Sequence, residues 1–199
     1  MSNTKNKYYV GFMVVLVTLV VYVAFTFQYT KVSADTFHNE IETVVYSYSD
    51  SVTILHEGDD SKEDSVSHPL NKAHIQQDVA MNADTLFTYT SVQNHTYILS
   101  DMGAGVGYYG YKYETAEQAL TALQEVEVAF TNMGIRPVAV NGVATYQAIN
   151  PDDPDNVTYW QVTSEENSLY MLMVDGYING LGGSPPIYKV FEDILSKMS

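Results

Sequence analysis

A row of aromatic residues has the clearest capacity to bind a ligand in this sequence. Tyr109, Tyr111 and Tyr113 alternate along the chain, and Trp160 lies in a later β-rich segment. Because successive side chains of a strand point to opposite faces, the three tyrosines would share one face of a sheet. Such rings can stack on sugar rings or polymer chains, and they can equally form half of a hydrophobic core. The two interpretations differ in whether the rings meet solvent.

An acidic segment, residues 150–156 (NPDDPDN), contains the residue types that calcium prefers. Asp152, Asp153 and Asp155 could supply hard oxygen ligands, so calcium is the one cofactor that the sequence suggests. The spacing departs from an EF-hand loop, in which oxygen ligands alternate before a glycine, because Pro154 would occupy the third ligand position. A calcium site and a solvated turn are therefore the two hypotheses for this segment.

Three glycines match a phosphate-binding pattern. Gly105, Gly107 and Gly110 fit GxGxxG, which dinucleotide-binding folds place at the start of a helix. Here the next helix signal begins only at Thr115, and no series of βαβ units follows. We therefore expect a flexible glycine-rich connection that leads into a strand.

The motifs that would identify a catalytic centre are missing from the sequence. It contains no HExxH zinc motif, no GxSxG nucleophile motif and no P-loop. We therefore assign no catalytic residue. With 24 acidic residues, an unrecognised pair of carboxylates could still act on an envelope polymer, and such a hydrolase remains an alternative.

Composition excludes several classes of function. The 199 residues include no cysteine, which rules out disulfides, thiolate metal sites and cysteine nucleophiles. Nine basic residues stand against 24 acidic ones, for a formal net charge of −15. A nucleic acid is not expected as a partner, because binding to phosphates needs a basic face.

A long uncharged segment near the N-terminus predicts a membrane span. Residues 8–30 contain no charged side chain, and Tyr8–Phe27 is almost continuously apolar or aromatic. As a helix, this stretch would span about 30 Å, the thickness of the hydrocarbon core of a bilayer. The lipid bilayer is therefore an expected partner. Lys5 and Lys7 precede the segment and only Lys31 follows closely, which predicts a cytoplasmic N-terminus.

The chain should therefore divide into four parts. We expect a cytoplasmic tail (1–7), a transmembrane helix (8–30), a juxtamembrane segment with an acidic loop (31–68) and an extracytoplasmic domain (69–199). The loop is expected at residues 57–67, which are polar and acidic. Small residues before Asp35 would allow a signal peptidase to cut after Ala34, and the domain would then be secreted.

A type IV pilin-like structural subunit is an alternative interpretation of the N-terminal region. Prepilins are cut between a glycine and a phenylalanine, as at Gly11-Phe12, and their apolar helix continues into an amphipathic one. A helical spacing does continue past the apolar segment, at Phe37, Ile41, Val44, Val45 and Tyr48. The glutamate expected at the fifth mature position is replaced by Leu16.

The pattern after the acidic loop is that of an α+β fold, an antiparallel sheet packed by about two helices. One helix should begin at a capping box, Thr115–Gln118, and end at Gly134, and another should follow Pro186. Hairpins are expected at residues 93–95, at Asn141-Gly142 and at 165–167. Strands are predicted at residues 86–92, 96–100, 108–113, 137–140, 143–149, 157–163 and 169–174, with 52–55 as an edge strand.

The last third of the chain resembles a known type of domain. A hairpin around Gly142, Trp160 in the next strand, the segment Tyr170–Leu172 before Asp175-Gly176, and a final amphipathic helix carry the resemblance. The region from Val138 to Ser199 is similar to small domains of unknown function in bacterial cell-envelope lipoproteins, which have a PsbP-like fold. The lipoprotein cysteine is missing, so the resemblance implies a non-enzymatic envelope module without a lipid anchor.

Together these features predict a single-pass membrane protein with an extracytoplasmic binding or interaction module. The module would be non-catalytic, and an envelope protein or a glycan would be its partner. The expected ligand-binding residues are Tyr109, Tyr111, Tyr113 and Trp160, and the expected calcium ligands are Asp152, Asp153 and Asp155.

Overall fold

The fold is described from a computed structural model, which covers residues 34–61, 70, 72, 75, 81 and 83–197. The described residues all belong to one compact unit of the chain, residues 31–199. The predicted transmembrane helix (8–30), the pilin-type cleavage site and most of the signal-peptidase site lie outside the described residues. Within the described residues, no helix combines the length and the apolar character that crossing a bilayer requires.

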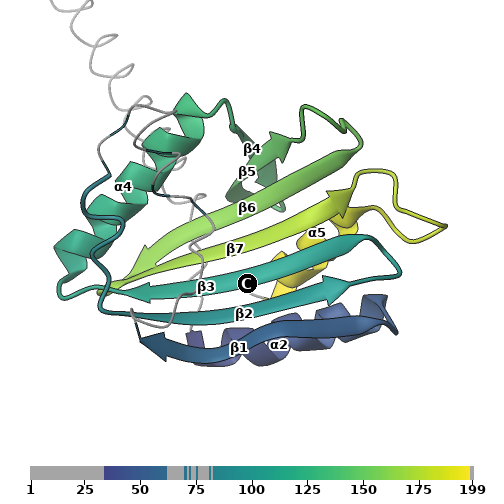
Figure 1. Cartoon of the computed structure of the whole chain (residues 1–199), viewed down its shortest axis with the longest axis horizontal. Coiled ribbons are helices and arrows are strands. Elements are labelled where there is room, and N and C mark those ends of the chain that lie inside the picture. The colour runs from purple at the N-terminus through teal and green to yellow at the C-terminus, as the bar shows by residue number, and fades with distance from the viewer. Residues whose placement is uncertain are drawn as a thin grey trace, which may run out of the picture. The chain divides into compact units, whose positions relative to one another are not determined.

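The domain is built on a seven-stranded sheet in which every neighbouring pair is antiparallel (Figure 1). The strand order is β1-β2-β3-β7-β6-β5-β4, so β3 pairs with a strand from much later in the chain. With its helices, the sheet confirms the expected α+β class. The strands are β1 (Val52–Ser61), β2 (Ser91–Leu99), β3 (Ala104–Lys112), β4 (Arg136–Val140), β5 (Val143–Ile149), β6 (Asn156–Glu165) and β7 (Ser168–Tyr177).

Three longer helices pack on the sheet, one more than the sequence predicted: α2 (Ala34–Tyr48), α4 (Ala116–Asn132) and α5 (Ile187–Lys197). The capping box of α4 is confirmed, because the Gln118 amide donates to Thr115 Oγ1 (3.2 Å) and the Thr115 amide donates to Gln118 Oε1 (3.0 Å). The additional helix is α2, whose apolar spacing the sequence shows.

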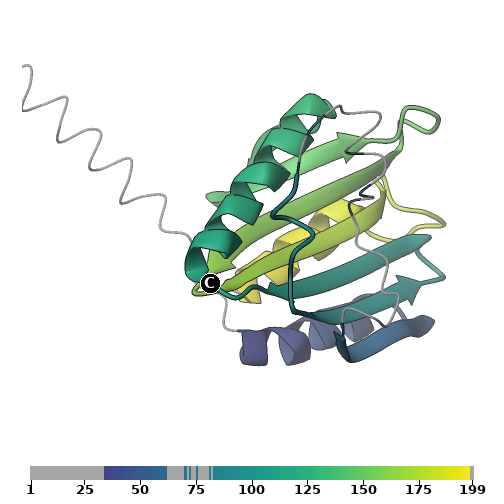
Figure 2. The same ribbon diagram turned by 60° about the vertical axis from the view of Figure 1, so that its left-hand side comes forward.

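Helices cover both faces of the sheet (Figure 2), and each face carries its own hydrophobic core. On one face, α2 and α5 bury side chains such as Val45 and Phe191 against the sheet. On the other face, α4 buries Ala122, Val126 and Phe130. Adjacent strand residues alternate between the two cores, as the period-two geometry of a strand requires. The two cores therefore share the sheet as a common wall.

The domain includes segments that the sequence analysis placed before it. Ile41 and Val45 of α2 are buried in the core, and β1 pairs with β2 from Val52↔Leu99 to Ser61↔Ser91. Residues 57–61 are thus the end of an edge strand and not part of a loop. Backbone pairing with β2 makes these polar residues a strand. The fold therefore begins well before residue 69.

One predicted hairpin is also corrected. Residues 93–95 do not form a turn, because β2 runs without interruption from Ser91 to Leu99 and pairs with β3 along that whole length. The predicted strand at 86–92 lies mostly in a turn and an extended segment before β2. The hairpin at Asn141-Gly142 is confirmed, with φ of 51° and 78° at the two residues.

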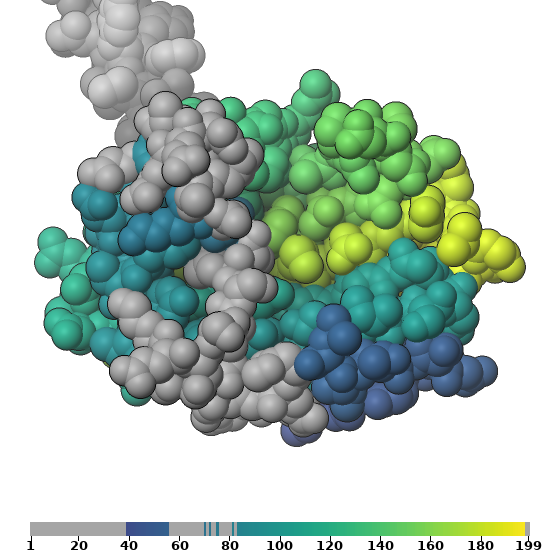
Figure 3. Space-filling view, in the orientation of Figure 1, coloured from purple at the N-terminus to yellow at the C-terminus, as the bar shows by residue number. Residues whose placement is uncertain are grey.

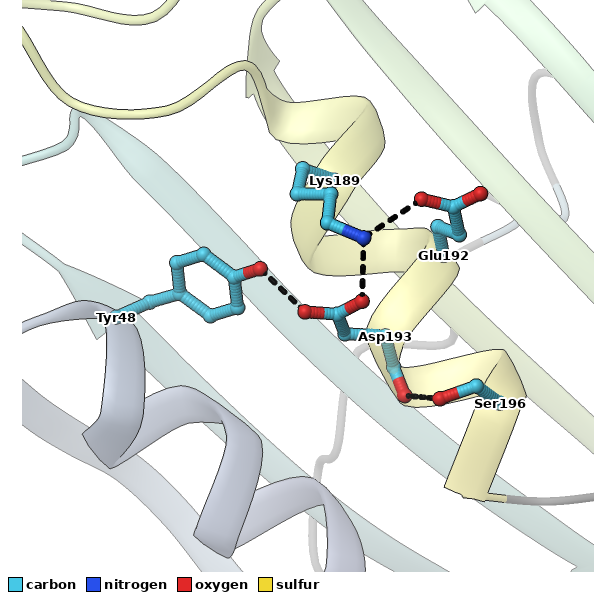
Figure 4. Close-up of polar contacts among 5 residues, drawn as sticks. All are labelled: Tyr48, Lys189, Glu192, Asp193 and Ser196. Carbon is cyan, nitrogen blue, oxygen red and sulfur yellow. Dashed lines mark hydrogen bonds and ion pairs between the residues drawn. The ribbon is translucent and has the colours of Figure 1, made fainter.

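A polar network joins α2 to α5 (Figure 4). The Tyr48 hydroxyl donates to Asp193 Oδ2 (2.5 Å), and Lys189 Nζ donates to Asp193 Oδ1 and to Glu192 Oε2, both at 2.8 Å. Lys189 and then Tyr48 lower the pKa of Asp193, because both stabilise its carboxylate. Burial and the bond to Asp193 raise the pKa of Tyr48 to about 12. The network fixes the end of α2 against the C-terminal helix.

We expect Tyr48→Phe to destabilise the domain by about 1 kcal/mol, because it removes a hydrogen bond to a charged group at a partly solvated site. The pKa of Asp193 is lower in the folded than in the unfolded chain. The ionised Asp193 therefore stabilises the fold at pH values above its unfolded pKa, and this stabilisation is lost as the pH falls through the folded pKa. Urea unfolding at neutral and acidic pH would measure both effects. Tyr46→Phe is the matched control, because Tyr46 is an exposed tyrosine of the same helix; equal stability of the two variants would contradict the role of Tyr48.

Candidate functional site

The aromatic residues predicted to bind a ligand lie in the core beneath α4. Tyr111 and Tyr113 are each 1% exposed, Tyr109 is 6% exposed and Trp160 is 7% exposed. Phe130 of α4 packs on Trp160 with a ring-centroid distance of 5.4 Å. A platform for sugar rings needs faces that meet solvent, so the interpretation as an exposed platform is corrected. The rings form part of the core beneath α4. Burial of their large apolar area is a stronger stabilising contribution than contact of the rings with water.

The hydroxyl and indole N–H groups of these aromatic residues are not suited to catalysis. The Tyr113 hydroxyl donates to the carbonyl of Leu86 (2.9 Å), and burial raises the pKa of both Tyr111 and Tyr113. These hydroxyls therefore stay protonated at neutral pH and cannot serve as bases. Trp160 Nε1 is buried without a hydrogen-bond partner in the described part of the chain. The role of these residues in the structure is packing.

The acidic segment 150–156 forms the turn between β5 and β6. Backbone bonds close it: the Asn150 amide donates to the Asn156 carbonyl (3.0 Å), and the Asn156 amide donates to the Asp153 carbonyl (2.9 Å). Asp152 and Asp155 are exposed. In the described residues, no group of three or more acidic or histidine side chains converges as a metal site would require. The geometry is that of the solvated turn, and the predicted calcium ligands Asp152, Asp153 and Asp155 are not brought together.

The three glycines of the GxGxxG pattern lie inside β3 and not in a connection before it. A Cβ on Gly105 would lie 2.6 Å from Asp175 Oδ1, and one on Gly107 would lie 2.9 Å from a ring carbon of Tyr109. A Cβ on Gly110 would lie 3.3 Å from two ring carbons of Tyr170. Each glycine therefore leaves room for a particular side chain, and the pattern reflects the packing of side chains on the sheet and not phosphate binding.

A hollow of about 320 Å³ opens over Gly110 on the sheet face that carries α2 and α5. The strand register explains it, because Gly110 lies directly between Gln93 of β2 and Tyr170 of β7 and has no side chain to fill the space. The next row of the sheet continues the polar lining and consists of Ser91, Lys112 and Ser168. Six residues with polar groups or an open backbone thus line the hollow: Ser91, Gln93, Gly110, Lys112, Ser168 and Tyr170.

The chemistry of this hollow is that of hydrogen bonding to a small polar molecule. Its lining residues carry two serine hydroxyls, an amide, a phenol and an ammonium group. Lys112 is exposed and makes no ion pair with any described residue. Tyr170 is held by a parallel stack on Tyr108, with ring centroids 6.2 Å apart and planes 7° apart. The lining contains no histidine, cysteine or carboxylate that would activate a serine hydroxyl.

Sequence analysis did not identify this hollow. Gly110, Tyr170 and Gln93 were noted only in other patterns: the glycine motif, the family resemblance and a predicted hairpin. The lining residues come from three strands that are far apart in the chain, and their register became visible only with the pairing of β3 and β7. No local motif marks such a site, because the positions lie in separate hairpins.

A second polar feature lies on the opposite face of the sheet. Asp175 of β7 is half-buried between Gly105 of β3 and Thr158 of β6. Burial raises the pKa of this carboxyl, because removal from water disfavours the charged form. Burial also raises the pKa of Tyr109, and the charge of Asp175 adds to this rise. The face that carries α4 is the one seen in Figure 3, where atoms of β6 and β7 lie at the surface.

Comparisons with known proteins do not assign the chain to a family. No family model matches the sequence, and no curated protein matches it. Among solved structures, the chain is similar to the extracellular domain of PknH from Mycobacterium tuberculosis, with 14% sequence identity and a TM-score of 0.43. The similarity covers 81% of this chain and 90% of that domain. The resemblance of the C-terminal third to PsbP-like lipoprotein domains stays a prediction.

We expect Asp175→Asn to make the domain more stable at neutral pH. The folded pKa of Asp175 is raised, so the wild-type chain is most stable below the unfolded pKa and loses stability as the pH rises through the folded value. The asparagine variant lacks this loss, so its advantage should vanish below about pH 3, where the carboxyl is neutral in both states. Urea unfolding against pH measures the difference. Asp155→Asn, at an exposed aspartate, removes the same formal charge, and an equal gain from it would contradict the role of burial.

Proposed function

We propose that this chain is a membrane-anchored, extracytoplasmic binding module of the cell envelope that performs no chemistry on its ligand. The observation that carries the binding function is the polar hollow over Gly110. The uncharged segment of residues 8–30 and the lysines before it support the anchor and the orientation. The lining of the hollow offers hydrogen-bond donors and acceptors without an activated nucleophile.

The ligand that best suits the hollow is a neutral molecule rich in hydroxyl groups, such as a unit of an envelope glycan. Hydroxyl, amide and ammonium groups from three strands can donate to and accept from such a molecule on several sides. The volume of about 320 Å³ lies at the lower end of the range for small-molecule sites. A strongly anionic ligand is disfavoured, because the chain as a whole carries a net charge of −15.

Two variants test the hollow, with chitotriose and maltotriose as the probes and the full chain in detergent micelles. We expect one or both sugars to shift the amide resonances of Gly110 and Tyr170. Gly110→Ala should abolish the shifts, because its methyl group occupies the floor of the hollow. Ser168→Ala should weaken binding by about two- to tenfold, as for the loss of one uncharged hydrogen bond.

Ser100→Ala is the matched control for Ser168→Ala, because Ser100 is exposed just beyond the other end of β2. It should bind as the wild-type chain does. Equal affinities of the two serine variants, or no response of the wild-type chain to either sugar, would remove the hollow as a glycan site.

A protease that cannot cross membranes tests the orientation of the chain. With intact cells or spheroplasts, we expect digestion of the domain after residue 30 and protection of a tag placed before Lys5, because the basic residues before the apolar segment favour the cytoplasmic side. Immunoblots against the tag and against the domain give the two readouts. A domain that becomes accessible only after lysis would contradict the proposed orientation.

A further inference from the structure

The half-buried carboxylate of Asp175 lies just beyond the core that α4 covers. Along β7, Met171 is buried in that core, Met173 is partly buried against it, and Asp175 follows on the same face. Its lateral neighbours are Gly105 of β3 and Thr158 of β6. The row that contains Asp175 therefore has no large side chain on either side of the carboxylate.

Glycines make the floor beneath this carboxylate. Asp175 Oδ1 would lie only 2.6 Å from a Cβ at Gly105, so the carboxylate rests directly over the backbone of β3. In the next row, the ring of Tyr109 lies over Gly107, whose Cβ would be 3.1 Å from the hydroxyl oxygen of that tyrosine. The side chains of Asp175 and Tyr109 thus occupy the space that two neighbouring glycines leave on one face, with an acid beside an aromatic ring.

No cation of the described residues neutralises Asp175. Its carboxylate makes no ion pair or side-chain hydrogen bond there. A hydrogen bond from its own backbone amide is the contact that opposes the effect of burial on this carboxyl. Keeping a carboxylate half-buried without an opposite charge still destabilises the fold, because a charge that leaves water needs compensation. An external cation would supply this compensation, and the net charge of −15 attracts cations to the domain.

The chemistry of the surroundings favours an organic cation over a metal ion. A metal would need several oxygen or nitrogen ligands, and the described residues offer no group of three or more acidic or histidine side chains. An ammonium or guanidinium group instead forms charge-assisted hydrogen bonds to a single carboxylate, and a guanidinium does so with two parallel bonds.

We propose that Asp175, on its floor of Gly105 and Gly107 beside Tyr109, is a binding site for one alkylammonium or guanidinium group. This site lies on the opposite face of the sheet from the hollow over Gly110, so it does not depend on the glycan-binding function. Its cation can belong to a free amine or to a lysine or arginine side chain of a partner. The half-exposed carboxylate would bind the cation directly.

The test uses the full chain in detergent micelles with two probes, agmatine and the tripeptide Gly-Arg-Gly. We expect saturable shifts of the amide resonances of Gly105, Gly107 and Asp175. Asp175→Asn should weaken binding about tenfold or more, as for the loss of a hydrogen bond to a charged group. Gly105→Ala keeps the charge but displaces the carboxylate, and it should also weaken binding. Both variants are first shown to fold by their amide spectra.

Asp155→Asn separates the site from the general acidity of the surface, because it removes one exposed charge and should leave the affinity within about twofold of the wild-type value. Tighter binding of the tripeptide would identify a partner side chain as the source, and tighter binding of agmatine would identify a free amine. Equal losses in Asp155→Asn and Asp175→Asn, or shifts that do not saturate, would overturn the proposal. Loss of sugar binding at Gly110 would leave these readouts unchanged.

Discussion

The structure depends on the pairing of β3 with β7, because this pairing joins two groups of strands that are otherwise independent. β1, β2 and β3 follow one another in the first group, and β4 to β7 form the second. The register from Gly105↔Asp175 to Lys112↔Ser168 aligns them over almost the whole length of β3. Every residue of β3 except Lys112 is buried, so this strand contributes to the cores on both faces. Both candidate sites include residues from each side of this junction.

Glycines make the junction unusual, since a glycine inside a strand weakens the strand by itself. β3 has three glycines, and the space of each is used by a side chain: Asp175, Tyr109 and Tyr170. Burial of the two tyrosines offsets part of the loss in strand propensity. On the face that carries α2 and α5, a hollow opens over Gly110 between Gln93 and Tyr170. On the other face, the carboxylate of Asp175 lies over Gly105. The strand that holds the sheet together therefore also shapes both polar features.

Local signals predicted the elements whose formation depends mainly on nearby residues. The capping box at Thr115, the hairpin at Asn141-Gly142 and the apolar stripe of α5 were all predicted within a few residues. Elements that depend on distant partners were predicted less well. The acidic end of β1 resembles a loop in composition and is a strand because β2 pairs with it. The polar residues Gln93 and Asn94 resemble a turn, and they continue β2 because β3 lies alongside them.

The sequence by itself determined the α+β class of the domain, the ends of its best-capped helix, the tightest hairpin, the absence of cysteine chemistry and the strongly acidic charge. These properties follow from composition and from contacts within a few residues. Only the tertiary structure decided that the tyrosine row is core, that α2 and β1 belong to the domain, and that two polar features flank β3. Those outcomes rest on which strands pair and in what register, and a one-residue slip would move every side chain of β3 to the other face.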